Sequence, residues 1–136
     1  FYIIKEICMN SISRAAAYDD MATKSMVMGA TSHGLVRLLF EELSGSLKSA
    51  EFYIEHGDEA NMRKSLSKAS RILAGLQGSL DFEKGGEIAT NLAELYRFCI
   101  KELYRANTAA DKEAISSVRA LIDPIQQAWS DMPQND

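Results

Sequence analysis

Apolar residues recur at alternating three- and four-residue steps in four long stretches of the chain, which is the spacing of one face of an α-helix. The first stretch begins at Thr31 or Ser32, whose hydroxyls can cap a helix, and it extends to about His56. Gly57 is a suitable terminator for this helix, and Asp58 can cap the next one. The apolar positions of the first stretch are Leu35, Val36, Leu39, Phe40, Leu43, Leu47, Ala50 and Ile54.

The other three stretches predict three more long helices. The second helix extends to about Leu80, and the third runs from about Glu87 to Ala106. The fourth follows a turn at 107–111, and Pro124 lies inside its pattern, which predicts a kink or a break near Ile122. The stripe of the second helix is Met62, Leu66, Ala69, Leu73, Leu76 and Leu80. The third carries Ile88, Leu92, Leu95, Cys99 and Leu103, broadened by Ala89, Tyr96 and Ile100. The fourth carries Ile115, Val118, Ile122, Ile125 and Trp129, flanked by Leu121 and Ala128.

Two adjacent glycines, Gly85 and Gly86, separate the second predicted helix from the third. Glycine reaches backbone angles that residues with a Cβ adopt only at a cost. Apolar residues approach this turn at three- and four-residue steps and leave it in the same way, which is typical of an antiparallel helical hairpin. The glycines are therefore expected to form the turn of that hairpin.

Together these stretches predict an all-α fold, an antiparallel (up-down-up-down) four-helix bundle with a short extra N-terminal helix at about 12–18. Residues 1–8 are unlike the rest and are interpreted as a trimmed or added extension. An N-terminal arm that contains the short helix is expected over 9–30, the bundle over 31–130, and a C-terminal tail over 131–136.

Composition and charge narrow the classes of function. The net charge is −4 and the basic residues are scattered, so nucleic-acid binding is not expected. No apolar run reaches the ~18 residues of a membrane-spanning helix, so membrane insertion is not expected either. The two cysteines are far apart, and a reducing, cytoplasmic setting is favoured over a disulfide framework. No metal site, cofactor or catalytic residue is expected, since the chain lacks metal-binding Glu-x-x-His pairs, a nucleophile elbow and a phosphate loop.

The apolar stripes are wider than a minimal bundle requires. Extra apolar residues lie beside already complete stripes: Val36, Phe40, Tyr96, Ile100, Leu121 and Ile125. Two interpretations account for this surplus. Either the N-terminal arm, Trp129 and the ordinary thickness of the core cover these residues, or they form a hydrophobic groove that accepts a partner's amphipathic helix. Composition does not decide between the two.

The run from Ser79 to Tyr96 resembles the signature of the flagellin-specific export chaperone family, FliS. The resemblance rests on Leu80-Asp81, Glu83-Lys84-Gly85-Gly86-Glu87-Ile88-Ala89, Asn91-Leu92 and Leu95-Tyr96, and is supported by Ala17-Tyr18, Thr31-Ser32-His33-Gly34-Leu35-Val36 and Ala128-Trp129. It spans about 15–129. Two departures are His33, where the family usually has proline, and Pro124.

The resemblance implies a cytoplasmic, non-enzymatic chaperone that binds the disordered C-terminal region of flagellin. Such a chaperone prevents premature polymerisation and delivers the subunit to an export-gate component of the flagellar type III secretion apparatus. A cochaperone and self-association into a homo-oligomer are further partners that the sequence leaves open. The alternative from another class is a structural helical bundle that self-associates through the same stripes and has no export client.

On this resemblance the client groove is placed between the second and third long helices. Its residues are Leu73, Leu76, Leu80, Ile88, Ala89, Asn91, Leu92, Leu95 and Tyr96, of which several must belong to the core. The resemblance also implies that the arm around Tyr18, Met21 and Met26 covers part of this groove when no client is bound. Methionine suits that role because it adapts to irregular surfaces.

Overall fold

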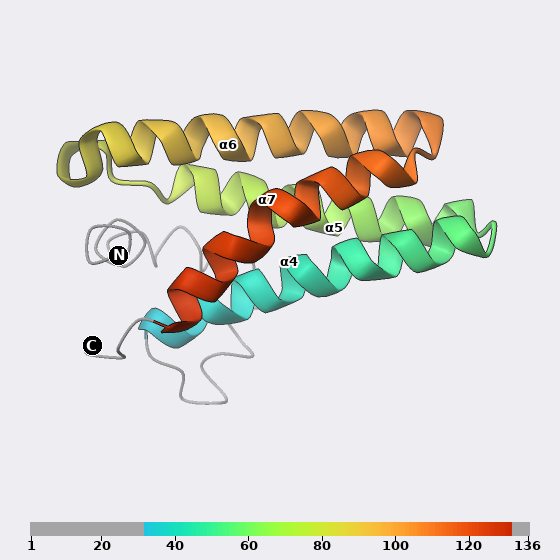
Figure 1. The fold of residues 1–136 in the computed structure, drawn as a ribbon, viewed down its shortest axis with the longest axis horizontal. Coiled ribbons are helices and arrows are strands. Elements are labelled where there is room, and N and C mark those ends of the chain that lie inside the picture. Colours follow the sequence, from blue (N-terminus) through green and yellow to red (C-terminus); the bar gives the residue numbers. More distant parts are fainter. Residues whose placement is uncertain (1–31, 132–136) are drawn as a thin grey trace.

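The computed structural model describes residues 32–131, and within that range it contains four helices and no strand. They are α4 (Ser32–Glu55), α5 (Glu59–Gly78), α6 (Phe82–Ala109) and α7 (Lys112–Asp131) (Figure 1). The all-α prediction is confirmed, and the helix ends lie close to those expected from the apolar spacing. The short helix and the arm expected before residue 31 lie outside the described residues.

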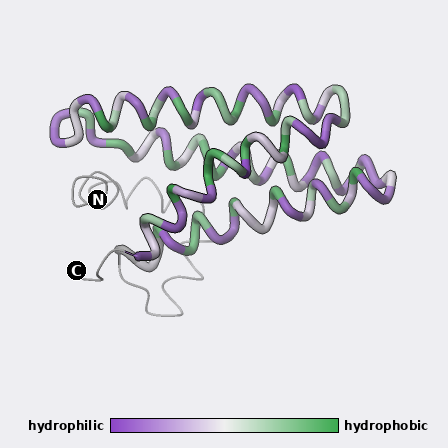
Figure 2. The backbone as a smooth tube through the Cα atoms, viewed as in Figure 1, coloured by the Kyte–Doolittle hydropathy of each residue, from purple (hydrophilic) through white to green (hydrophobic). Residues whose placement is uncertain are grey.

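Consecutive helices run in opposite directions and form a bundle in which each helix has two close neighbours. α4 packs against α5 and α7, and α6 packs against the same two helices. Figure 2 shows apolar and polar residues alternating along every helix, as expected when one face of each helix is buried. The up-down-up-down order of the predicted bundle is therefore observed.

The connection between α4 and α5 forms as the sequence predicts. Gly57 has a φ of +68°, in the left-handed region that favours glycine. The Asp58 carboxylate then accepts a hydrogen bond of 3.2 Å from the backbone N–H of Asn61, which satisfies a free donor in the first turn of α5. The terminator and the cap predicted at these two positions are confirmed.

The two adjacent glycines, Gly85 and Gly86, have different backbone conformations. Gly86 has φ 50° and ψ −123°, so the chain changes direction there, and a short helical turn precedes it within α6. Gly85 lies in that turn and donates its N–H to the Asp81 carbonyl at 2.8 Å. The Asp81 carboxylate caps the same turn by accepting from the N–H groups of Glu83 and Lys84. The backbone angles of Gly86 therefore account for the change of direction in this connection.

Pro124 does not end α7, so of the two outcomes predicted near Ile122 the break does not occur, and the kink stays a prediction. The helix continues from Lys112 to Asp131 with Pro124 inside it. Proline removes one backbone N–H and leaves the carbonyl four residues earlier without its helical partner. Here that carbonyl belongs to Ala120, and both residues are exposed, so water can bind it and the helix tolerates the loss.

The core runs along the centre of the bundle and contains at least one aromatic residue from three of the four helices. Phe40, Tyr96 and Trp129 are among its largest fully buried side chains. Most members of the predicted stripes are buried with them. The other core residues larger than alanine, of which Ile72 alone lies outside the predicted stripes, are Val36, Leu39, Leu43, Leu47, Met62, Leu66, Ile72, Leu73, Leu76, Leu80, Leu92, Cys99, Leu103, Ile115, Val118 and Ile122.

Tyr96 and Tyr104 lie on the same helix in opposite environments, which gives a matched test of this core. Tyr96 is 1% exposed and Tyr104 is 73% exposed. We expect Tyr96→Ala to lower the free energy of unfolding by about 3–5 kcal/mol, because it leaves a cavity in the core. Tyr104→Ala should change it by less than about 0.5 kcal/mol. Urea denaturation of both variants measures the difference, and equal effects would contradict the assignment of Tyr96 to the core.

Cys99 provides a second test, because burial raises the pKa of its thiol to about 11, with a smaller contribution from the charge of Glu102. The thiolate is the reactive form, so alkylation of the folded protein at pH 8 should be slow. We expect iodoacetamide to modify Cys99 in a Cys8→Ser variant only when denaturant is added, as followed by mass spectrometry. Rapid modification of the native protein would show that the thiol is accessible.

Candidate functional site

The structure divides the nine predicted groove residues between the core and the surface. Ile88, Asn91 and Leu95 of α6 reach the surface, Leu95 only in part. The other six are buried: Leu73, Leu76, Leu80, Ala89, Leu92 and Tyr96. The wall expected from α5 therefore lies inside the bundle in this structure, and client contact at these residues stays a prediction.

The exposed apolar residues of α7 lie on the flank that faces away from α4. Arg119 of α7 donates to the Glu51 carboxylate of α4 at 2.9 Å, and Ser116 lies 3.4 Å from the same carboxylate. These contacts show which flank of α7 faces α4. At 3.6 residues per turn, Leu121 and Ile125 fall on the opposite flank, toward the other neighbour, α6.

The same geometry identifies the flank of α6 that faces α7. α4 and α6 run in the same direction with α7 between them, so they turn opposite flanks toward it. Viewed from the N-terminus of α4, Glu51 lies clockwise of the buried stripe and contacts α7. The α6 flank toward α7 is therefore the counter-clockwise one, which carries Ile88, Leu95 and Phe98.

These two flanks separate along their length. α7 begins beside the C-terminal end of α6 and runs away from it toward the start of α4 (Figure 1). The two helices thus diverge toward the start of α6 and the end of α7, and apolar side chains on their facing flanks are left at the surface. We call Ile88, Leu95, Phe98, Leu121 and Ile125 the apolar strip.

Exposure within the apolar strip is substantial. Phe98 is 48% exposed, and Ile88 and Leu121 are each 36% exposed. Leu95 and Ile125 are half-buried and pack against the core, so they link the strip to the interior. Exposed apolar side chains on the flanks of two neighbouring helices suit an amphipathic helix that lays its apolar face across them.

Two ion pairs hold the N-terminal half of α7 against α4. Besides the Arg119–Glu51 pair, the Lys112 ammonium contacts the Glu55 carboxylate. This hydrogen bond is the main cause that lowers the pKa of Glu55 and raises the pKa of Lys112. Trp129, 1% exposed, anchors the other end of α7 in the core. These contacts lie at both ends of α7 and accompany its path along α4.

Sequence reasoning found part of the apolar strip. Ile88 and Leu95 were among the predicted groove residues, and Leu121 and Ile125 were recognised as surplus apolar positions. Phe98 was missed because it lies outside the stripe of its helix; an aromatic residue on a polar face was the signal available. Tyr18, Met21 and Met26 lie outside the described residues.

Other kinds of site find little support between residues 32 and 131. That range contains no group of three or more His, Cys, Asp or Glu side chains placed to hold a metal ion. It also has no helix with the length and apolar content needed to cross a membrane.

Comparison with known proteins gives a consistent assignment. Residues 14–136 match the family model described as flagellar protein FliS. The chain is 42% identical over 122 residues to the flagellar secretion chaperone FliS of Salmonella typhimurium, covering 89% of this chain and 90% of that protein. It is 34% identical to the Escherichia coli protein of the same name, over 85% of each chain. The flagellar secretion chaperone FliSB of Pseudomonas aeruginosa is 31% identical, over 89% of this chain and 96% of that protein.

The helical bundle, the apolar strip and these matches over most of the chain agree with one another. The chain belongs to the FliS family of flagellar secretion chaperones.

Proposed function

We propose that this chain binds the disordered C-terminal region of flagellin along the apolar strip, prevents its premature polymerisation and delivers it to the flagellar type III secretion apparatus. The observation that carries the proposal is the divergence of α6 and α7, which leaves five apolar side chains fully or partly exposed on the facing flanks of these helices in a member of the flagellar secretion chaperone family. A client segment that cannot bury its own apolar face aggregates or assembles until another surface covers it.

Binding without catalysis fits this task. Ordering a disordered segment costs free energy, and contact with apolar surface must offset that cost. The client is then released when another partner takes its place, and no reaction has to drive the exchange. We therefore propose a non-enzymatic chaperone that acts in the cytoplasm without a cofactor.

The predicted groove residues that lie in the core do not contact the client in this proposal; they hold the exposed residues of the apolar strip in place. Leu92 and Tyr96 are buried beside Leu95 on α6, and their packing fixes the positions of the exposed members. Asn91, exposed one turn from Leu95, is available to hydrogen-bond the client. An export-gate component, a cochaperone and a second copy of the chain are further partners that we propose for other surfaces or other stages.

The arm before residue 31 is the proposed cover of the strip in the absence of client. Tyr18, Met21 and Met26 have the apolar, adaptable side chains that such a cover needs. The arm and the client then compete for the same surface, so the apparent dissociation constant of the client rises by the reciprocal of the fraction of molecules in which the strip is uncovered.

The apolar strip can be tested by placing a charge on it. We expect Ile88→Glu and Leu121→Glu each to weaken binding of a flagellin C-terminal fragment at least about tenfold, which corresponds to ~1.4 kcal/mol. A carboxylate on the strip would lose its hydration when the client covers it. Isothermal titration calorimetry measures the dissociation constants.

Phe52 offers the matched control, since it is 53% exposed on α4 and lies off the strip. Phe52→Glu should leave the affinity within about twofold, and all three variants should keep their melting temperatures within a few degrees. Equal affinity in the two strip variants and the parent would place the client elsewhere. Light scattering at increasing concentration, with and without the fragment, separates client binding from self-association.

Deleting residues 1–22 tests the arm. The bundle should stay folded, because its four helices begin at Ser32. Affinity for the flagellin fragment should increase, by about tenfold if the arm covers the strip in nine molecules out of ten. Calorimetry with the full chain and the truncated chain gives the ratio, and an unchanged dissociation constant would remove the arm from the mechanism.

A further inference from the structure

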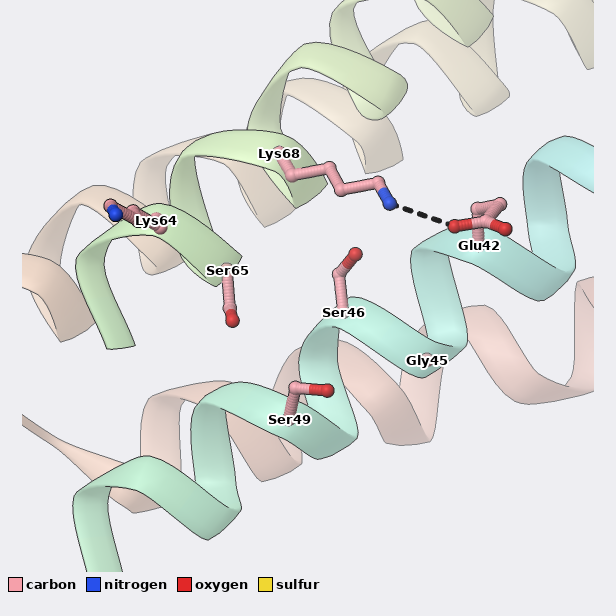
Figure 3. Close-up of a pocket in the computed structure, with 7 residues that line it drawn as sticks. All are labelled: Glu42, Gly45, Ser46, Ser49, Lys64, Ser65 and Lys68. Atoms are coloured by element: carbon pink, nitrogen blue, oxygen red, sulfur yellow. Dashed lines mark hydrogen bonds and ion pairs between the residues drawn. The ribbon is translucent and has the colours of Figure 1, made fainter. Parts of the chain in front are cut away.

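A second surface lies on the seam between α4 and α5. A shallow cleft of about 400 Å³ is lined by Glu42, Gly45, Ser46 and Ser49 of α4 and by Lys64, Ser65 and Lys68 of α5. In Figure 3 the Lys68 side chain reaches across to Glu42, and the hydroxyls of Ser46 and Ser65 point into the space between the helices. We call this feature the seam cleft; apart from Glu42, Lys64 and Lys68, its walls are glycine and serine.

Gly45 in the middle of α4 is not required by the packing of this chain. A Cβ added there would meet no atom within 4 Å, and the residue is exposed. Glycine inside a helix is destabilising relative to alanine, and here no internal contact compensates. Because Gly45 has no side chain, the surface beside the seam cleft is open at this position.

The outer face of α5 is the basic surface of an acidic chain. α5 contains Arg63, Lys64, Lys68 and Arg71 against the single acidic residue Glu59, so it carries a net charge of +3 where the whole chain carries −4. Glu59 pairs with Arg63 and Glu42 pairs with Lys68. Lys64 and Arg71 form no ion pair with the described residues.

We propose that the seam cleft and the basic face of α5 form a docking site for an acidic amphipathic helix of a partner protein. Lys64, Lys68 and Arg71 follow one another at four- and three-residue steps and so form one stripe about 10 Å long. Carboxylates at the same spacing on a partner helix would face all three cations. The short side chains at Gly45, Ser46 and Ser49 let that helix lie close to α4.

A protein helix fits this surface better than a membrane or a nucleic acid. The stripe spans only two helical turns, and Glu41 and Glu42 of α4 lie beyond it. An extended anionic surface would meet those carboxylates as well as the cations, and the net charge of −4 would repel it. A single acidic helix along the stripe meets the cations of α5 and, of the two carboxylates, only Glu42 in the seam cleft, whose charge Lys68 already balances.

The docking site is separate from the apolar strip. The seam cleft lies between α4 and α5, whereas the strip lies on the facing flanks of α6 and α7. The two surfaces therefore share no helix. A partner on the seam cleft can therefore bind while a client occupies the strip. The docking site stands on its own contacts and does not require flagellin to be the client.

The test uses the full-length chain, labelled with 15N, and an alanine-based helical peptide with glutamates at four- and three-residue spacing. We expect the amide signals of Gly45, Ser46, Lys64 and Ser65 to shift during the titration at low salt, and the shifts to disappear at about 0.3 M NaCl because the attraction is screened. The same peptide with glutamine in place of glutamate should cause no shift.

Variants assign the shifts to the site. Lys64→Glu combined with Arg71→Glu should weaken peptide binding at least fivefold, and Gly45→Leu should do the same by filling the cleft. The matched controls are Lys101→Glu on α6 and Ala120→Leu on α7, both exposed, which should stay within twofold of the parent. Circular dichroism confirms that each variant is folded.

Several results would overturn the docking site. These are shifts centred on other helices, equal binding of the glutamine peptide, no shift at millimolar peptide, or controls that weaken binding as much as the seam variants. Vesicles of phosphatidylglycerol provide the last comparison. If they bind through Lys64 and Arg71 and the peptide does not, the surface recognises anionic lipid and the proposal of a protein partner is wrong.

Discussion

The packing of α7 against α4 determines which apolar side chains of this bundle reach the surface. Ion pairs from Glu51 and Glu55 hold the first half of α7, and the buried Trp129 holds its far end. Because α7 runs toward the start of α4, it moves away from α6 after its first turns. The apolar flanks of α6 and α7 therefore do not cover each other along their whole length. Partly exposed ion pairs contribute little to the free energy of unfolding, so we assign them the role of orienting α7 along α4. Burial of Trp129 supplies the larger share of the stability of this contact.

This arrangement gives one small domain two chemically different surfaces. The apolar strip suits a client whose apolar face must be hidden, and contact there depends little on salt. The seam cleft has serine and glycine between charged side chains, so the partner proposed for it would bind through electrostatic attraction that salt weakens. Since the two surfaces lie on different helix pairs, the two partners proposed for them would not compete for the same residues.

The sequence predicted the helices and their ends because local chemistry fixes both. Gly57, Asp58 and Gly86 act through their own backbone angles or nearest neighbours, and the structure places them as expected. The sequence did not decide whether Pro124 kinks or breaks its helix, because tolerance of the lost hydrogen bond depends on exposure of Ala120, a tertiary property. The exposed residues of the groove were more difficult to predict. Leu92 and Leu95 both belong to the apolar stripe predicted for the third helix, yet Leu92 is buried and Leu95 is half-buried. The path of α7 makes that difference, and no local pattern encodes it.

The most direct test of this account follows the methyl groups of the apolar strip by NMR while a flagellin C-terminal fragment is added. The account predicts large shifts and new intermolecular contacts at Ile88, Leu95, Leu121 and Ile125, with little change at Leu39 and Leu43, buried in α4. Contacts confined to other helices, or a strip that stays unchanged when the fragment is bound, would contradict it.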